Sequence, residues 1–251
     1  ENHQLSERTR LTLQRLLRQG VKVILASGRS PASMRPTVQL IETPHPYIPY
    51  HGAQIVDSKT GKVLVANEIS AELARSVLTW FEEKDIYTQY YYGDDWFFKS
   101  QCSISDEYSH SSGVVGTEAG IKLSEHISAG TPKLLAVADP KDVPALIEEA
   151  RSIFGKELMI TTSKPFFIEI TSPKATKGNA VRELAGMIGL SPDTTICAGD
   201  SLNDMSMLEW SKLPVTVANG RDEMKQMAWK IAGDGHRDGM AILLDELIPE
   251  V

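Results

Sequence analysis

Carboxylate and amide side chains directly follow an apolar stretch of the sequence, "TTICAG", in the order Asp200, Asn203 and Asp204. The stretch predicts a strand, and an apolar helical pattern begins at Met205. Open α/β sheets bind ligands beyond the carboxyl ends of their strands. Oxygen ligands of this kind suit Mg²⁺, which keeps several waters and is commonly shared with phosphate. The alternative is that Asp200 only caps the helix at a turn.

Two further motifs have side chains suited to an anion. Ser27 follows the apolar run "VKVIL", and its hydroxyl and the N–H of Gly28 can both donate hydrogen bonds, while Arg29 adds a planar cation. Lys177 opens a predicted helix in "TKGNA", where a cation beside a helix N-terminus favours a phosphoryl group. A plain turn and a solvated surface lysine are the alternative interpretations of these two motifs.

The elements that must position these side chains alternate between helix and strand. "LSERTRLTLQRLLRQG" predicts a helix with Ser6 as N-cap, and "VKVILAS" predicts a strand buried on both faces. After residue 172 the order is helix "KGNAVRELAGMIG", strand "TTICAG", helix, strand "LPVTVA" and helix. This alternation predicts an α/β core with a Rossmann-like, doubly wound parallel sheet.

The middle of the chain has a different pattern. Helix "ISAELARSVLTWFEEKD" is followed by "IYTQYYYGDDWFFKS", whose alternating aromatic and polar residues predict antiparallel strands about a turn. "TPKLLAVAD", "LMITTS" and "PFFIEITS" predict further strands around another helix. We therefore expect an α+β unit over residues 67–171, inserted into an α/β core made of residues 1–66 and 172–251.

The composition narrows the classes of function. The chain has 251 residues, 41% of them apolar, and a net charge of −7, and no basic stripe is present that would neutralise nucleic-acid phosphates. It has no membrane-length apolar segment and no visible signal peptide. Of the two cysteines, Cys102 and Cys197, the second lies in a predicted apolar strand, which argues against a disulfide. These features predict a cytoplasmic protein that binds neither nucleic acid nor membrane.

In this order, "S-G-R", "K-G" and "G-D-x-x-N-D" resemble the motifs of the haloacid dehalogenase superfamily, and more narrowly of Cof-type phosphatases with a type IIB cap. The resemblance covers nearly the whole chain, with residues 67–171 as the cap. It implies that Ser27, with Gly28, and Lys177 bind the transferring phosphoryl group. Arg29 is a further candidate for phosphate binding on the chemistry of its planar cation, with pinning of the loop as the alternative role. It also implies that Asp200 ligates Mg²⁺ and that Asn203 contacts the phosphate. From the loop residues alone, orienting Lys177 is an alternative role for Asn203, and we expect Asp204 to hold the metal ligands in place without binding the ion.

Two departures from the family pattern stand out. The family often has Asn-Gly-Ala where this chain has His51, Gly52 and Ala53, so His51 either presents a polar group to the site or is a hinge residue. The family's first motif, D-x-D-x-T, which supplies the nucleophile and the general acid/base, does not occur in the sequence. We expect that motif on a segment upstream of residue 1. The core sheet should then have a slot between the strands ending at Ser27 and Gly199, because both strands are apolar along their whole length.

The resemblance thus predicts a Mg²⁺-dependent phosphatase that hydrolyses small phosphate monoesters, most plausibly sugar phosphates, through an aspartyl-phosphate on an upstream Asp. A phosphomutase and a hydrolase specific for one disaccharide phosphate are close alternatives. A phosphate-binding or regulatory homologue without the nucleophile is an alternative of another class. The expected partner is a small phosphorylated metabolite, and the expected state is a monomer or homodimer.

Overall fold

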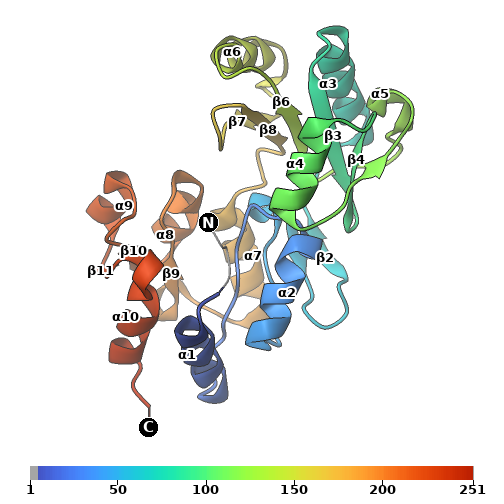
Figure 1. Cartoon of the computed structure of the whole chain (residues 1–251). Helices are drawn as coiled ribbons and strands as arrows, with labels where there is room; N and C mark the ends of the chain where they lie inside the picture. The colour runs from blue at the N-terminus through green and yellow to red at the C-terminus, as the bar shows by residue number, and fades with distance from the viewer. Residues whose placement is uncertain (1–4, 251) are drawn as a thin grey trace. The chain divides into compact units, whose positions relative to one another are not determined.

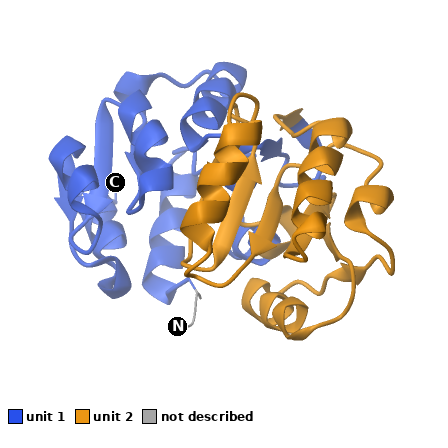
Figure 2. Ribbon diagram, turned by 90° about the horizontal axis from the view of Figure 1, so that it is seen from above, with its two compact units in different colours: residues 1–28, 34–64, 176–251 blue, residues 29–33, 65–175 orange. Residues whose placement is uncertain are grey.

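The computed structural model describes residues 5–250, which form two compact units (Figures 1 and 2). Among the described residues, unit 1 comprises 5–28, 34–64 and 176–250, and unit 2 comprises 29–33 and 65–175. The chain therefore leaves unit 1 near residue 65 and returns to it at residue 176. The sequence predicted these crossings near residues 66 and 172, and the assignment of the units as core and cap stays a prediction.

Unit 1 contains a parallel sheet in the order β11-β10-β9, with helices following the strands. Leu213 of β10 pairs with Ile196 of β9, and Val215 pairs with Lys230 of β11. The predicted α/β alternation is thus confirmed in this part of the chain. The elements assigned wholly or partly to unit 1 are α1 (Glu7–Arg18), α2 (Pro31–Ile41), β1 (Gln54–Val56), β2 (Val63–Ala66), α7 (Lys177–Ile188), β9 (Ile196–Ala198), α8 (Met205–Trp210), β10 (Leu213–Val217), α9 (Asp222–Met227), β11 (Lys230–Ala232) and α10 (Gly239–Leu247).

Local signals explain where several of these helices begin and end. The Ser6 side chain accepts a hydrogen bond from the N–H of Thr9 at 3.0 Å, as expected of the predicted N-cap of α1. Thr176 caps α7 in the same way, by accepting from the N–H of Asn179. Gly189 ends α7 in the left-handed conformation, which glycine adopts without steric cost.

The segment "VKVILAS" was predicted to be a strand of the core sheet, and this prediction is wrong. Residues 21–27 form no strand of the sheet and make only an isolated parallel bridge, from Ala26 to Ile48. The N–H of Ser27 donates to Ile48 at 2.8 Å, and the N–H of Ile48 donates to Leu25 at 2.8 Å. The segment therefore has a hydrogen-bonded neighbour on one side, and β9 is not its neighbour on the other. The ladder does not extend beyond this bridge because Pro46 has no N–H to donate and Tyr50, with a φ of 50°, has left the extended conformation. The other edge of the segment has no partner strand among residues 5–250.

Unit 2 is an α+β unit, as predicted, built on a largely antiparallel sheet in the order β5-β4-β3-β6-β8-β7. Its buried apolar side chains pack between this sheet and its helices. Figure 1 shows α3 and α6 in this part of the chain. The elements are α3 (Ala71–Glu83), β3 (Tyr87–Tyr92), β4 (Asp95–Phe98), α4 (Ser103–Ser112), β5 (Thr117–Glu118), α5 (Leu123–His126), β6 (Leu134–Val137), α6 (Val143–Phe154), β7 (Met159–Thr161) and β8 (Phe167–Thr171).

The sequence reasoning missed α4, because "SISDEYSHSS" has no apolar period and is rich in serine. Its first turn is fixed locally: the Ser105 hydroxyl donates to the carbonyl of Cys102 and accepts from the N–H of the same residue. Throughout residues 5–250, no helix is long and apolar enough to cross a membrane.

Candidate active site

The first residue of α7 carries a buried cation. Only 7% of the Lys177 side chain and 5% of the Asp204 side chain is exposed, and the Lys177 Nζ lies 2.5 Å from the Asp204 Oδ1. A buried ammonium group needs a partner because its desolvation is costly. The structure therefore brings the predicted lysine of "TKGNA" to the predicted acidic loop of "GDSLND", two motifs that are far apart in the sequence.

Asp204 organises the loop that follows β9. Its Oδ2 accepts hydrogen bonds from the N–H groups of Asp200 and Ser201, each at 3.1 Å. A Cβ added to Gly199 would lie 2.3 Å from the Asp204 Cβ, so only glycine allows this approach. Both carboxylate oxygens of Asp204 are thus engaged by the protein, which suits a supporting role and not direct metal ligation.

Asn203 joins this cluster through its amide oxygen. The Oδ1 accepts from the Ser201 hydroxyl at 2.7 Å and from the Lys177 Nζ at 3.4 Å. The amide nitrogen lies 3.3 Å from the Nδ1 of His51. Asn203 is exposed, so its amide group can reach a ligand as well as the lysine.

The turn at Tyr50–Gly52 brings the Ser27 loop to the same place. The N–H of His51 donates to the carbonyl of Ser27 at 2.9 Å. A Cβ added to Gly28 would lie 2.2 Å from the His51 Cε1, and one added to Gly52 would lie 2.2 Å from the carbonyl oxygen of Thr176. Glycines therefore permit the Ser27 loop, the His51 turn and the start of α7 to meet.

Five of the predicted site residues accordingly belong to one connected set of contacts in unit 1: Ser27, Gly28, Lys177, Asn203 and Asp204. Asp200 lies on the same loop, where its N–H donates to Asp204. Arg29 is assigned to unit 2, so its predicted place beside the phosphoryl group stays a prediction. His51, whose role the sequence left open, is part of this set.

The protein supplies too few oxygen atoms to hold a divalent cation alone, so a cation at this site would also need oxygens from water and from a bound phosphate. The Asp200 carboxylate is exposed and makes no hydrogen bond or ion pair with any residue in 5–250. Within the same range, no group of three or more His, Cys, Asp or Glu side chains is arranged to hold a metal. A single available carboxylate is consistent with Mg²⁺, which is often held by one or two carboxylates, waters and phosphate oxygens.

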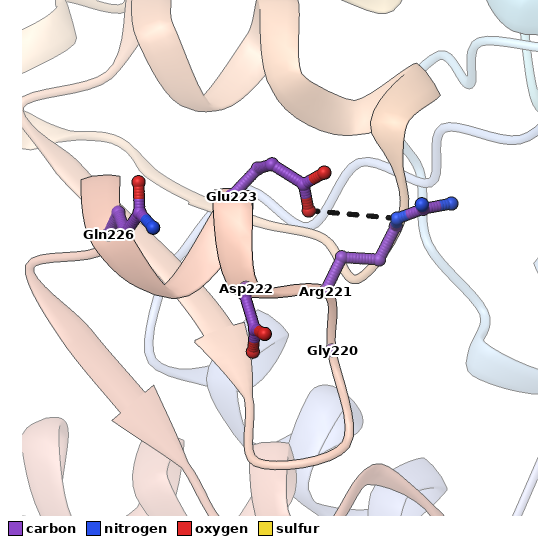
Figure 3. A pocket seen from close by; sticks show the side chains of 5 residues that line it. All are labelled: Gly220, Arg221, Asp222, Glu223 and Gln226. Atoms are coloured by element: carbon purple, nitrogen blue, oxygen red, sulfur yellow. Dashed lines mark ion pairs between the residues drawn. The ribbon is translucent and has the colours of Figure 1, made fainter.

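A hollow near Asp200 is formed by the turn after β10 and the start of α9 (Figure 3). Figure 3 shows Arg221 paired with Glu223, and the separation of their charged groups is 3.7 Å. The N–H of Arg221 donates to the carbonyl of Asp200 at 3.3 Å. None of the converging residues lines this hollow, so we do not assign it as the anion site.

A second cavity, of about 620 Å³, lies in unit 1 between residues 21–26 and β9. Its wall includes Ile24 and Ala26 on one side and Ile196 and Ala198 on the other. The predicted slot is therefore present, and the segment ending at Ser27 does not pair with β9.

Backbone direction shows that both walls of the slot present polar groups. Residues 25 and 27 bond to Ile48, so the alternate residues Ile24 and Ala26 direct their N–H and C=O groups to the other side. On the opposite wall, the N–H of Gly199 bonds to β10, so by the same alternation Ile196 and Ala198 face the slot. The groups of these residues have no hydrogen-bond partner among residues 5–250 on that side.

Comparisons with known proteins assign the chain to one family. Residues 1–244 match the model of the haloacid dehalogenase-like hydrolases. Phosphatase YwpJ of Bacillus subtilis is 24% identical, over 98% of this chain and 94% of its own. The HMP-PP phosphatase of Cronobacter sakazakii is 24% identical, over 89% of this chain and 81% of its own. The crystal structure of TM0651 from Thermotoga maritima superposes with a TM-score of 0.91, at 24% identity, and covers all of this chain and 93% of its own.

Proposed function

Because the chain belongs to the haloacid dehalogenase-like hydrolase family, we propose that it is a Mg²⁺-dependent phosphatase acting on small phosphate monoesters, with sugar phosphates as the expected substrates. The observation that carries this proposal is the convergence of Lys177, Asn203 and the Ser27 loop around one set of contacts in unit 1. A lysine ammonium, an amide and a hydroxyl beside backbone N–H groups are the donors that a phosphoryl dianion requires.

In this proposal the donors have separate roles. Lys177 offsets charge on the transferring phosphoryl group, and Ser27 with the N–H of Gly28 binds its oxygens. Asn203 bonds another oxygen, and Asp204 holds Lys177 and the loop in place through its two engaged oxygens. Asp200 would hold the Mg²⁺ ion, which when bound supplies positive charge beside the phosphate and the leaving oxygen.

The nucleophile in this proposal is an Asp upstream of residue 1, which forms an aspartyl-phosphate that water then hydrolyses. The slot supports this part of the proposal. A strand parallel to β9 that filled the slot would end beside Gly199 and Ser27, next to Lys177. Its backbone would pair with the unsatisfied groups on both walls, and its side chains would occupy an apolar cavity.

The experiment that tests the proposal is a screen of phosphorylated metabolites with full-length protein, with release of inorganic phosphate measured with Mg²⁺ and with EDTA. We expect Mg²⁺-dependent release from some sugar phosphates and little from phosphodiesters. Tight phosphate binding without release from any compound would instead favour a phosphate-binding homologue, and the proposal of a phosphatase would be abandoned.

A further inference from the structure

The turn that carries His51 has an unusual backbone. Tyr50, His51 and Gly52 have φ angles of 50°, 57° and 103°, so consecutive residues lie in the left-handed region. This conformation is uncommon for residues other than glycine and persists only where tertiary contacts impose it. The turn holds the Cε1–Nε2 edge of the His51 ring against Gly28 and the Nδ1 of His51 toward Asn203.

The hydrogen bonds of Asn203 determine which way its amide points. Lysine has only donors, so the Asn203 atom that faces the Lys177 Nζ at 3.4 Å must be the oxygen. The amide NH₂ group then faces His51, 3.3 Å from the Nδ1. An NH₂ group only donates, so the Nδ1 of His51 must be the acceptor and carry no proton. The neutral ring therefore has its proton on Nε2.

We propose that His51, in this Nε2–H form, is a binding residue for the phosphoryl group. Its Nδ1 holds the Asn203 amide against Lys177, and its Nε2–H, over Gly28, donates to an oxygen of the bound anion. This inference rests on the proposed function for the identity of the anion. It adds a neutral donor to the site, beside the charged donor of Lys177.

The position of Gly28 supports this assignment. A Cβ at residue 28 would lie 2.3 Å from the Nε2 and 2.2 Å from the Cε1 of His51. The absence of a side chain therefore lets the Nε2 edge approach the backbone of the Ser-Gly turn, whose N–H is itself a proposed anion donor. One face of the anion would thus be bound by the turn and by the imidazole together.

The first test is spectroscopic and does not depend on activity. In ¹⁵N-labelled full-length protein, long-range ¹H–¹⁵N correlation spectra should show His51 with an unprotonated Nδ1 and a protonated Nε2. Inorganic phosphate added with Mg²⁺ should shift the Nε2 signal of His51 and leave that of His45 unchanged. A protonated Nδ1, or a His51 signal that does not respond to bound phosphate, would overturn the inference.

Substitutions separate binding from folding. His51→Ala removes the ring, and we expect the affinity for inorganic phosphate to fall about tenfold, equivalent to about 1.4 kcal/mol. His51→Asn keeps a short amide in a residue type that tolerates the left-handed conformation, and it should recover part of that loss. His45→Ala is the control and should bind phosphate as the unaltered protein does.

The outcomes also distinguish this inference from the proposed function. Unaltered phosphate affinity in a folded His51→Ala variant would exclude His51 as a ligand and leave the phosphatase proposal standing. Phosphate binding that depends on His51, in a protein that hydrolyses no phosphate ester, would support the inference and reject the phosphatase proposal.

Discussion

At the scale of single residues, the site depends on one buried charge pair. Lys177 and Asp204 are nearly inaccessible to solvent, and each of the Asp204 oxygens has protein partners. Removing one member of such a pair leaves an uncompensated buried charge, which is far more costly than the pair's net contribution.

We therefore predict that Asp204→Asn lowers the free energy of unfolding by about 3–5 kcal/mol. Urea denaturation followed by circular dichroism measures this change. The matched control is Asp222→Asn, since Asp222 pairs with Lys225 at 3.3 Å on the exposed surface of α9. The control should hardly alter the midpoint. Equal midpoints for the two variants would contradict the buried pair.

Substitution of Asp200 should have the opposite effect to that of Asp204: phosphate release should be lost and the free energy of unfolding should not change. Its carboxylate is exposed and has no protein partner among residues 5–250, so Asp200→Ala should leave the unfolding midpoint unchanged. We expect Mg²⁺-dependent phosphate release to fall by about a hundredfold or more, since the ion loses its carboxylate ligand. Glu209→Ala, at an exposed residue of α8, is the control. Near-normal turnover of Asp200→Ala at ordinary Mg²⁺ concentrations would exclude Asp200 as the ligand.

At the scale of elements, close approaches between backbones position the site. The turn at Tyr50–Gly52 touches the start of α7, and a Cβ at Gly52 would meet the Thr176 carbonyl oxygen at 2.2 Å. The start of α7 also approaches α8, where a Cβ at Gly178 would lie 2.2 Å from the Ser206 carbonyl oxygen. Displacement of either contact would move Lys177.

A pair of glycine substitutions tests this positioning. Gly61 has a φ of 71° with open space around it, so Gly61→Ala incurs only the backbone strain of about 1 kcal/mol. Gly52→Ala, at a φ of 103°, incurs larger backbone strain and also a clash with the start of α7, so it should be clearly less stable than Gly61→Ala. Thermal unfolding of the two variants measures the difference. Equal melting temperatures would contradict the close packing of this turn.

The burial of strand β9 can be tested through the reactivity of its cysteine, Cys197. Burial raises the pKa of the Cys197 thiol to about 11, although its hydrogen bond with Ser211 acts in the opposite direction. The thiolate is then a minor species at pH 8, and only the thiolate reacts with iodoacetamide. We expect the partly exposed Cys102 to be alkylated first and Cys197 to react only in denaturant, as peptide mass spectrometry can show. Rapid labelling of Cys197 in the folded protein would contradict this burial.

The sequence predicted elements best where a local signal and an apolar period agree. Ser6 and the leucine period define α1, and the tyrosine-rich alternation defines β3 and β4. It failed for residues 21–27, because the ladder with the Ile48 segment is interrupted at Pro46, which has no N–H to donate, and the other edge has no partner strand among residues 5–250. The apolar composition of residues 21–27 reveals neither condition. In the site, the motifs indicated Lys177 and Asp204 separately, but their direct pairing depends on tertiary packing.

At the scale of the whole molecule, the slot is the feature with the clearest consequence for function. If an upstream strand fills it in full-length protein, the N–H groups of Ile24, Ala26, Ile196 and Ala198 become hydrogen-bonded and buried. We predict slow hydrogen exchange at those amides, comparable to that of the core of β10. Amide exchange followed by NMR measures this directly. Fast exchange at all four would show an open slot and would remove the support for an upstream nucleophile strand.

The division of the chain into units also bears on how the protein is made. Unit 2 consists mainly of the continuous stretch 65–175, whereas unit 1 combines segments from before and after that stretch. The ribosome synthesises the chain from its N-terminus. Domains generally fold as units during this synthesis. The stretch 65–175 of unit 2 therefore leaves the ribosome, and can fold, before the C-terminal part of unit 1 has left it. The apolar side chains among residues 21–26 are covered in part by α7 and the segment around β9, so they stay exposed to solvent and to other nascent chains until those later segments have been made.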